Sequence, residues 1–264
     1  MQRITSRQNP IVAEYRAAAR GDAGAPMLLD GAHLVSDAVA AGLTLQHVLV
    51  AADAPLTRPE IARILERVPA TVSVADAHAQ VMDAVSPVRS SSLIVALADR
   101  PASNTSVFTG SSPLVVVVCD VQDPGNLGAI LRVAEGAGAT GAIVAGQSAD
   151  PFGWKALRGS MGSALRLPIR RSASVADAVR ESRAHGARVV ATVPRGGTAL
   201  FDAPFTGPVS LLIGGEGPGL PPEVIEHADM RVTIPMDAPV ESLNAAVAAA
   251  VLLYEARRQR TVAV

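Results

Sequence analysis

Three short segments of this chain combine glycine, proline, amide and acidic residues in ways that ordinary helices and strands do not accommodate. They span residues 120–132, 213–220 and 234–244. The second segment holds four glycines, one proline and one acid, Glu216, directly after an apolar run. Glycine allows positive φ and close backbone approach, and proline fixes its own φ. We expect here a strand that ends in a shaped loop with exposed amides, or else a turn that binds nothing.

The polar side chains of the other two segments are also unusual for their positions. Asn126 is placed as a helix N-cap or as a ligand amide, and Arg132 follows on a helix face partly shared with it. An arginine there either pairs with an acid such as Glu135 or serves a ligand. In the third segment Ser242 is a good N-cap, whereas Asn244 has weak helix propensity and requires polar partners.

Several familiar sites are excluded because their patterns are missing. No Gly-Lys-Ser/Thr follows the glycines, no Gly-x-Gly-x-x-Gly opens the first helix of the second half, and there is no Gly-x-Ser-x-Gly elbow. Cys119 is the only cysteine and lies in an apolar run, which excludes a disulfide framework and a zinc cluster, and we expect no metal. A polar amino terminus and the lack of a long apolar stretch predict a cytoplasmic protein without signal peptide or membrane span.

The elements that must position these segments alternate between strands and helices. Residues 114–119 form an apolar, mostly β-branched run, typical of a strand buried on both faces of a parallel sheet. Further strands are expected at 142–145, 188–193, 210–213 and 231–234, and helices at 126–136, 175–184, 222–227 and 242–260. The pattern predicts a doubly wound parallel sheet, in which ligands gather beyond the carboxyl ends of the strands. The three segments all follow strands, so they form a pocket if they converge.

The first hundred residues show a rhythm of their own. Strands are expected at 27–29, 45–51, 70–74 and 93–97, and helices at 11–20, 31–41, 59–68 and 76–85. They predict a compact α/β sandwich. A stretch rich in Pro, Ser, Thr and Asn then indicates a linker. We therefore place one domain at 1–99, a linker at 100–112 and a second domain at 113–264.

The formal net charge of −1 argues against a protein that coats nucleic acid, but the basic residues are concentrated locally. Residues 152–171 contain one lysine and four arginines with no acid, and the amino-terminal segment is also rich in arginine. Solvated surface charge is the alternative to a nucleic-acid contact. The residues that we expect to contact RNA phosphates are Arg3, Arg7, Lys155, Arg158 and Arg166.

Taken together, the three segments resemble the SpoU (TrmH-type) RNA 2′-O-ribose methyltransferases. DPGNLGAILR at 123–132 resembles the first motif of that family, IGGEGPGL at 213–220 the second, and IPM at 234–236 with ESLNAAVA at 241–248 the third. The resemblance covers about residues 113–264, with the motifs in the family's order. Residues 4–10 and 30–35 are more loosely similar to the small substrate-binding domain often placed before such catalytic domains. One departure is Ala245-Ala246, where the family often has a small hydroxyl residue.

The resemblance implies an α/β catalytic domain with a trefoil knot in its carboxy-terminal part, a homodimer and S-adenosylmethionine as methyl donor. The acceptor that it implies is a ribose 2′-hydroxyl of RNA; the separate amino-terminal domain favours large-subunit rRNA, with tRNA as the alternative. The catalytic residues that it implies are Asn126, Arg132, Glu216, Ser242 and Asn244. The cofactor-binding residues that it implies are Thr192, Val193, Pro194, Gly197, Ile213, Gly214, Gly215, Glu216, Gly217, Ile234, Pro235, Met236, Ser242 and Leu243.

Elementary chemistry restricts what the arginine of the first motif can do. A ribose hydroxyl is a poor nucleophile near neutral pH, and a free guanidinium, with a pKa above about 12, is a poor base there. We therefore expect Arg132 to stabilise the developing alkoxide and to hold an adjacent phosphate. Two alternatives are a non-catalytic RNA-binding or ribosome-assembly factor and a small-molecule nucleotide-binding enzyme. The complete catalytic set argues against the first, and the basic segment and amino-terminal domain argue against the second.

Overall fold

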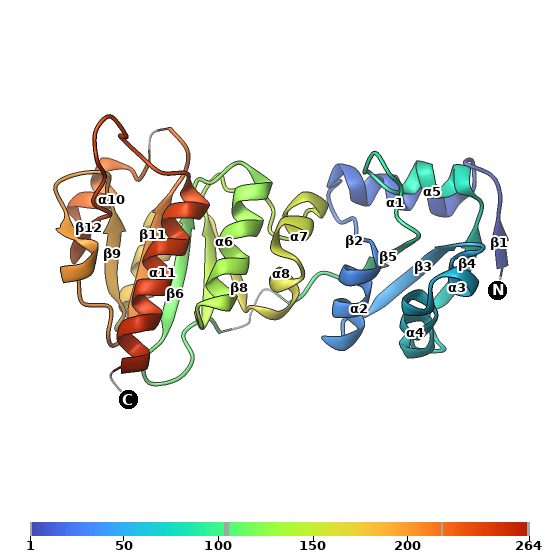
Figure 1. Cartoon of the computed structure of the whole chain (residues 1–264), viewed down its shortest axis with the longest axis horizontal. Helices are drawn as coiled ribbons and strands as arrows, with labels where there is room; N and C mark the ends of the chain where they lie inside the picture. Colours follow the sequence, from blue (N-terminus) through green and yellow to red (C-terminus); the bar gives the residue numbers. More distant parts are fainter. Residues whose placement is uncertain (1, 103–105, 218, 263–264) are drawn as a thin grey trace. The chain divides into compact units, whose positions relative to one another are not determined.

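The computed structural model describes residues 2–102, 106–217 and 219–262, and its contacts divide the chain into two compact units (Figure 1). Unit 1 comprises Met1–Pro101 and Phe152–Arg166, and unit 2 comprises Ala102–Pro151 and Leu167–Val264. The boundaries expected from the sequence place residues 152–166 in the second domain, whereas their contacts are with the first unit. Residues 103–105 of the expected linker lie outside the described residues.

Unit 1 is built on a five-stranded sheet in the order β1-β4-β3-β5-β2, in which β5 runs antiparallel to both neighbours and the other pairs are parallel. The strands are β1 (Gln2–Ile4), β2 (Met27–Asp30), β3 (Leu45–Ala51), β4 (Ser73–Ala77) and β5 (Ile94–Ala98). The first five helices are α1 (Pro10–Arg20), α2 (Ala32–Ala40), α3 (Ala54–Thr57), α4 (Pro59–Arg67) and α5 (Ala79–Val85). Helices α1 and α5 cover one face of this sheet and bury their apolar stripes against it. The predicted α/β arrangement of this part is confirmed, although β1 and α3 were not predicted.

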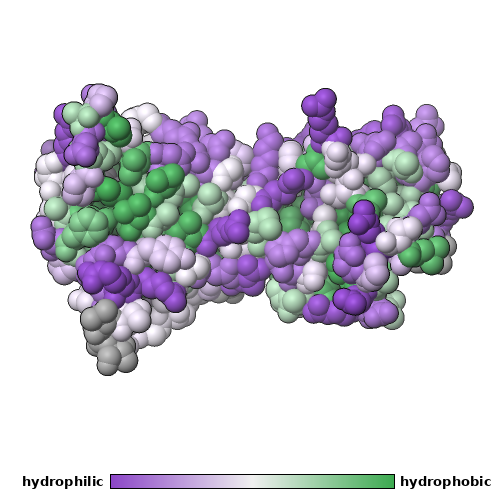
Figure 2. Space-filling view, in the orientation of Figure 1, coloured by the Kyte–Doolittle hydropathy of each residue, from purple (hydrophilic) through white to green (hydrophobic). Residues whose placement is uncertain are grey.

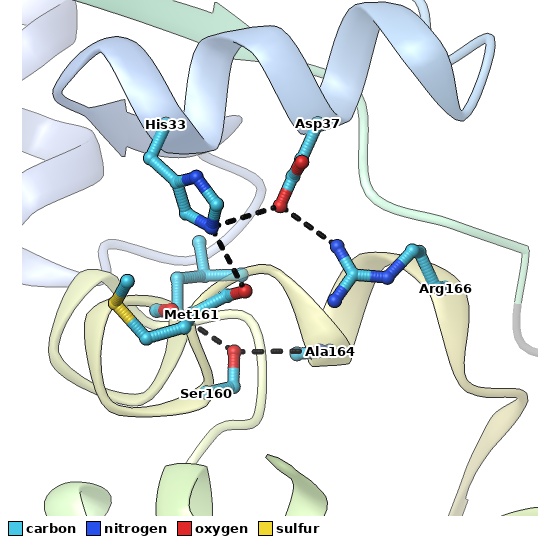
Figure 3. A network of polar contacts seen from close by, with 7 residues as sticks. His33, Asp37, Ser160, Met161, Ala164 and Arg166 are labelled. Atoms are coloured by element: carbon cyan, nitrogen blue, oxygen red, sulfur yellow. Dashed lines mark hydrogen bonds and ion pairs between the residues drawn. The ribbon is translucent and has the colours of Figure 1, made fainter. Parts of the chain in front are cut away.

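Two further helices complete unit 1: α7 (Trp154–Ser160) and α8 (Ser163–Arg166). Arg158 Nη1 lies 3.1 Å from Oδ2 of Asp30, whose side chain is fully buried, and Ser86 Oγ donates to Oδ1 of the same carboxylate at 2.9 Å. Arg166 Nη1 lies 2.7 Å from Oδ2 of Asp37 on α2 (Figure 3). Arg158 and Arg166 of the basic segment thus find acids almost 130 residues earlier in the chain, which local patterns cannot reveal.

Replacing Arg158 with alanine is expected to destabilise unit 1 by about 1–3 kcal/mol, because a buried carboxylate loses its charged partner. Arg20→Ala is the matched control: its pair with Asp22 lies in the same unit and is exposed, and such pairs contribute less than about 1 kcal/mol. Urea unfolding monitored by the fluorescence of Trp154, the only tryptophan and a member of unit 1, measures both. Equal effects of the two substitutions would contradict the structural importance of the Arg158–Asp30 pair.

Unit 2 is built on a seven-stranded sheet in the order β10-β12-β9-β11-β6-β7-β8, and every neighbouring pair is parallel. Its strands are β6 (Leu114–Cys119), β7 (Gly141–Ala145), β8 (Ile169–Ser172), β9 (Arg188–Thr192), β10 (Thr198–Ala199), β11 (Val209–Gly214) and β12 (Met230–Thr233). Its helices are α6 (Pro124–Gly136), α9 (Val175–Ala184), α10 (Pro222–Glu226) and α11 (Ala245–Val262), with a 3₁₀ turn at Leu200–Asp202. The predicted parallel sheet is confirmed. The strands β8 and β10 at its two edges were missed.

Alternating residues of the central strands pack into two hydrophobic layers, one on each face of the sheet. Val115, Val117 and Cys119 of β6 pack with residues of α9 and α10 on one face of the sheet. Helices α6 and α11 pack together over the other face (Figure 1). Burial raises the pKa of the Cys119 thiol, which disfavours thiolate chemistry there and agrees with a structural cysteine. Within the described part of the chain, no helix has the length and apolar character that crossing a lipid bilayer requires.

Candidate active site

A cavity of about 400 Å³ lies beyond the carboxyl ends of β9, β11 and β12. Such a volume is typical of sites for small ligands and cofactors. Its lining includes most of the residues singled out from the sequence for cofactor binding: Thr192, Val193, Pro194, Ile213, Gly214, Gly215, Glu216, Gly217, Ile234, Met236, Ser242 and Leu243. Gly197 and Pro235 are not among the lining residues. The second and third segments therefore do meet at one edge of the sheet.

Sequence reasoning missed part of the cavity wall. The residues not foreseen are Gly219, Leu220, Ile225, Val232, Ala245, Ala248 and Leu252. Three of these, Ala245, Ala248 and Leu252, follow helical spacing along the first turns of α11, so they share one face of that helix. Once the start of α11 is known, this periodicity is a signal that could have identified them.

The second segment forms the tightest part of the wall. A Cβ atom added at Gly214 would lie 2.6 Å from both the carbonyl carbon of Gly219 and the backbone nitrogen of Leu220, so no larger residue fits there. An isolated bridge joins Gly215 to Gly219 and folds the loop back on itself. The loop thereby presents backbone, rather than side chains, to the cavity. This agrees with the shaped loop expected from the glycines; Pro218 of the same segment lies outside the described residues.

A chain of hydrogen bonds joins all three segments beside this cavity. Asn126 Nδ2 donates to Oε1 of Glu216, and Asn244 Nδ2 donates to Oδ1 of Asn126 at 3.1 Å. Glu216 and Asn244 line the cavity, whereas Asn126 lies behind them on α6. Residues separated by 90 and 118 positions in sequence are thus brought into direct contact.

The two helix starts at this site differ from the sequence-based expectations. Asp123, not Asn126, caps α6: its Oδ1 accepts from the backbone N–H of Asn126 at 2.7 Å. The prediction that Ser242 caps the last helix is wrong. Helix α11 begins at Ala245. Oδ1 of Asn244 accepts hydrogen bonds from the backbone N–H groups of Ala246 and Val247 at 2.9 and 3.3 Å. Asn244 therefore finds the polar partners that its position requires.

Arg132 lies on the exposed surface of α6 and is not among the residues that line the cavity. Among the residues that the structure describes, it has no hydrogen-bond or ion-pair partner, so the expected alternative of a pair with Glu135 is not formed. An arginine kept unpaired in water is free to take a ligand from solution. Arg132 occupies the helix that carries Asn126, six residues further on.

The five residues singled out for RNA fall into two groups. Arg3, Arg7 and Lys155 are exposed on unit 1. Arg158 and Arg166 are instead engaged by Asp30 and Asp37 of the same unit. The structure therefore leaves the first group accessible and commits much of the charge of the second group to contacts within the chain.

Glu216→Gln is expected to lower the rate of the reaction at this site about tenfold, because a neutral acceptor holds Asn126 less firmly than a carboxylate does. The side chain keeps its size, so the cavity and its affinity for a ligand should be little changed. Steady-state kinetics measures the effect on the rate, and calorimetric titration of the ligand measures the effect on its affinity. A variant that loses ligand binding but keeps its turnover would show that Glu216 contacts the ligand instead of orienting Asn126.

Comparison with known proteins agrees with this geometry. Residues 113–254 match the SpoU rRNA Methylase family. An uncharacterized tRNA/rRNA methyltransferase of Synechocystis sp. is 34% identical over 97% of this chain and 94% of its own length. The 23S rRNA (uridine(2479)-2′-O)-methyltransferase of Streptomyces viridochromogenes is 41% identical over 63% of this chain and 60% of its own length.

The solved structures agree as well. The AdoMet-bound rRNA methyltransferase of Sinorhizobium meliloti superposes with a TM-score of 0.86 at 30% identity, covering 97% of both chains. The likeness extends over both units and not only over the part that carries the three motifs. Because its second and third motifs line one cavity, its first motif is hydrogen-bonded to both, and a relative matches 97% of its length, this chain belongs to the SpoU rRNA Methylase family.

Proposed function

We propose that this protein is an S-adenosylmethionine-dependent enzyme that methylates a ribose 2′-hydroxyl of large-subunit rRNA. The observation that carries the proposal is the hydrogen-bonded chain Glu216–Asn126–Asn244 at the edge of the glycine-walled cavity. The 23S rRNA methyltransferase of Streptomyces viridochromogenes and the AdoMet-bound enzyme of Sinorhizobium meliloti support the substrate class and the methyl donor.

The cavity suits the proposed donor in size and in chemistry. Backbone of residues 213–217, Ile234 and Met236 supplies donors and acceptors, and Leu220, Ile225 and Leu252 supply apolar surface. When bound, S-adenosylmethionine supplies an electrophilic methyl group on a sulfonium. The enclosing loops would hold that group in one orientation and keep water from it. Positioning of this kind accounts for a large part of the rate enhancement in transfers between two bound partners.

The residues that would bind the acceptor ribose are carried by α6. Asn126, held by Glu216 and Asn244, offers an oriented amide that would hold the ribose. Arg132 offers an unpaired guanidinium whose fork suits a phosphate and an oxygen that gains negative charge. In this mechanism the hydroxyl proton leaves to solvent or to the RNA itself, and Arg132 keeps all of its own protons.

The RNA-binding surface that we propose lies on unit 1, over α1 and α5. Arg7 Nε donates to the carbonyl of Gln80 at 2.9 Å, and Arg16 Nε donates to the carbonyl of Ala84 at 3.3 Å. Those carbonyls are four residues apart on α5, about 6 Å along its axis. The two guanidinium groups are therefore neighbours, and their terminal nitrogens make no hydrogen bond within the described residues. We propose that, together with exposed Arg3 of β1, they form a basic edge suited to successive phosphates.

Reversing the charge of this edge is expected to flatten the salt dependence of RNA binding by about one unit of slope for each phosphate that the edge no longer neutralises. The variant is Arg7→Glu with Arg16→Glu, and Arg63→Glu on α4, another helix of the same unit, is its matched control. Binding of an rRNA fragment measured across a range of salt concentrations gives the slope. An equal change in slope for the control would remove α1 and α5 as the preferred RNA-binding surface.

We further propose that the enzyme is a homodimer joined through α11 and α6. Val247, Val251 and Tyr254 of α11 are 50%, 37% and 53% exposed and follow helical spacing along one face. Half-buried Ala129 and Val133 of α6 are the neighbouring apolar residues. Figure 2 shows apolar side chains gathered over these two helices. A contiguous apolar face on a protein surface marks an interface, and a two-fold axis would bury it against its own copy.

The family resemblance also implies a trefoil knot in the carboxy-terminal part of unit 2, and we propose one here. The arrangement that supports it is the return of the chain after β12. From the flank of the sheet, next to β10, residues 234–244 pass along the cavity to α11, which packs on α6 and β11 at the centre. The third motif would then be part of the threaded segment.

Methyl transfer to purified RNA tests the proposal. The protein is incubated with S-adenosylmethionine and either ribosomal RNA or tRNA, and ribose methylation is mapped by mass spectrometry. We expect one 2′-O-methylated ribose in the large-subunit rRNA, and Arg132→Ala should abolish it. Methylation of tRNA alone would reassign the substrate, and cofactor binding without transfer to either RNA would favour a non-catalytic factor.

A further inference from the structure

The residue that connects β6 to the first motif has an unusual backbone. Asp120 has φ of 54°, and within the described residues it is one of two non-glycine residues with positive φ. Left-handed backbone is unfavourable for residues with a Cβ, and aspartate and asparagine tolerate it best because their short polar side chains can bond locally. Such conformations persist only where the surroundings enforce them, and they gather at functional sites.

The loop after β7 holds Asp120 in this conformation. Asp120 Oδ1 accepts from the backbone N–H of Gln147 at 2.7 Å, and its own N–H donates to the carbonyl of Ala145 at 3.3 Å. The carboxylate also occupies the space over Gly146, where an added Cβ would lie 2.3 Å from Oδ1. The next residue is fixed as well: Val121 donates to Ser148 Oγ at 3.1 Å and accepts from Ala149 at 2.9 Å.

The other side of Asp120 meets the second motif. A Cβ added at Gly215 would lie 2.3 Å from the carbonyl oxygen of Asp120, so the two backbones touch at this point. Gly215 immediately precedes Glu216, and the loop that begins at Asp120 leads to the cap at Asp123 and to Asn126. At Asp120, therefore, the backbone of the segment that carries Asn126 contacts the backbone of the segment that carries Glu216. This contact lies next to the one between the Asn126 and Glu216 side chains.

We propose that Asp120 is a positioning residue: its left-handed backbone, held by the carboxylate on the β7 loop, sets the distance at which Asn126 meets Glu216. It contacts neither side chain directly, and it does not line the cavity. This inference rests on the proposed function for its kinetic consequence, but the geometry it describes exists without substrate.

Three substitutions at Asp120 separate the contributions of its left-handed backbone, its acceptor oxygen and its negative charge. Asp120→Asn keeps the tolerance of left-handed φ and one acceptor oxygen, and it should turn over close to the wild-type rate. Asp120→Gly keeps the backbone freedom without the acceptor, and Asp120→Ala lacks both. Both are expected to lower kcat about 100-fold, the effect of a displacement of about 1 Å at a reacting site, while KM for S-adenosylmethionine changes little. An Asn variant as impaired as the Ala variant, or a Gly variant as active as wild type, would overturn the proposal.

A second pair of variants tests the packing of the carboxylate on Gly146. Gly146→Ala places a methyl group against Asp120 Oδ1, and Gly186→Ala is the matched control, with φ of 70° and no atom within 4 Å of the added Cβ. Gly146→Ala should lower kcat, and Gly186→Ala should not. In the Asp120→Gly background the added methyl meets no carboxylate, so Gly146→Ala should cause little further loss. Full additivity of the two substitutions would contradict the packing of Asp120 on Gly146.

Hydrogen exchange measured without RNA keeps this inference separate from the proposed function. Amides of residues 121–126 and 215–217 should exchange faster in Asp120→Gly than in the wild type, and at the wild-type rate in Asp120→Asn. If the wild type transferred no methyl group to RNA, the proposed function would be wrong. The exchange data would still test whether Asp120 positions the two segments. Unchanged exchange in the glycine variant would overturn the positioning role.

Discussion

Arg132→Lys is expected to lower methyl transfer by about 10²–10³-fold, the usual loss when one donor that stabilises a developing oxyanion is removed. Lysine keeps the positive charge but replaces a planar fork of donors by a single ammonium, so it cannot hold a phosphate and the alkoxide together. Because Arg132 is exposed, does not line the cavity and has no partner within the described residues, the fold should be unaffected.

Single-turnover kinetics with saturating S-adenosylmethionine measures this effect, and calorimetry of the donor and filter binding of the RNA provide the controls. Both affinities should stay near those of the wild type. The matched control is Arg257→Lys, an exposed arginine on α11 whose guanidinium donates to the carbonyl of Gly136. A fully active Arg132→Lys enzyme would show that charge alone suffices and that the fork geometry is irrelevant.

Val251→Glu is expected to convert the enzyme to a monomer and to lower its activity about 100-fold. A carboxylate in the middle of the exposed stripe of α11 would be buried without a partner if the two copies associated, at a cost that exceeds a typical interface contact. Activity should fall with it because α6, which carries Arg132 and Asn126, borders the same face, so in the proposed dimer the partner copy would restrain the acceptor side of the site.

Sedimentation equilibrium and turnover, measured over the same protein concentrations, test this link. Leu56→Glu is the control, because Leu56 is an apolar residue 88% exposed on unit 1, a different unit from the one that carries α11. In the wild type, activity should fall on dilution together with the dimer. If Val251→Glu were monomeric and fully active, the interface would be unnecessary for catalysis, and a dimeric variant would place the interface elsewhere.

Much of unit 2 could be predicted because its signals are local. The apolar run of β6 requires a strand buried on both faces, and its predicted bounds, 114–119, are those of the structure. Glycines at 214–219 can occupy conformations that other residues avoid, so a shaped loop followed from their spacing alone. The order of the three motifs then identified the family, and most of the expected cofactor residues line one cavity.

The failures of prediction have a common physical origin in long-range contacts. Residues 152–166 resemble a basic stretch of the second domain, yet the acids that accept their charge, Asp30 and Asp37, come from the beginning of the chain. The short strands β1 and β10 were missed because they are defined by pairing with a neighbouring strand, β4 and β12, and not by their own composition. Ser242 and Asn244 are both capping residues by type, and only the path of the chain along the cavity selects Asn244.

The sequence by itself determined that this protein has two α/β parts and where five of the seven strands of the parallel sheet lie, and the resemblance of its three motifs indicated which polar residues belong to one family of sites. The two parts and the strands follow from side-chain volume, apolar periodicity and glycine spacing, all of which act over a few residues. Only the tertiary structure decided that Glu216 accepts a hydrogen bond from Asn126, that Asn244 caps α11 while bonding Asn126, and that Asp120 holds two motifs together. Each of these depends on directional contacts between segments up to 118 residues apart, which become specific only when the sheet brings its strand ends to one edge.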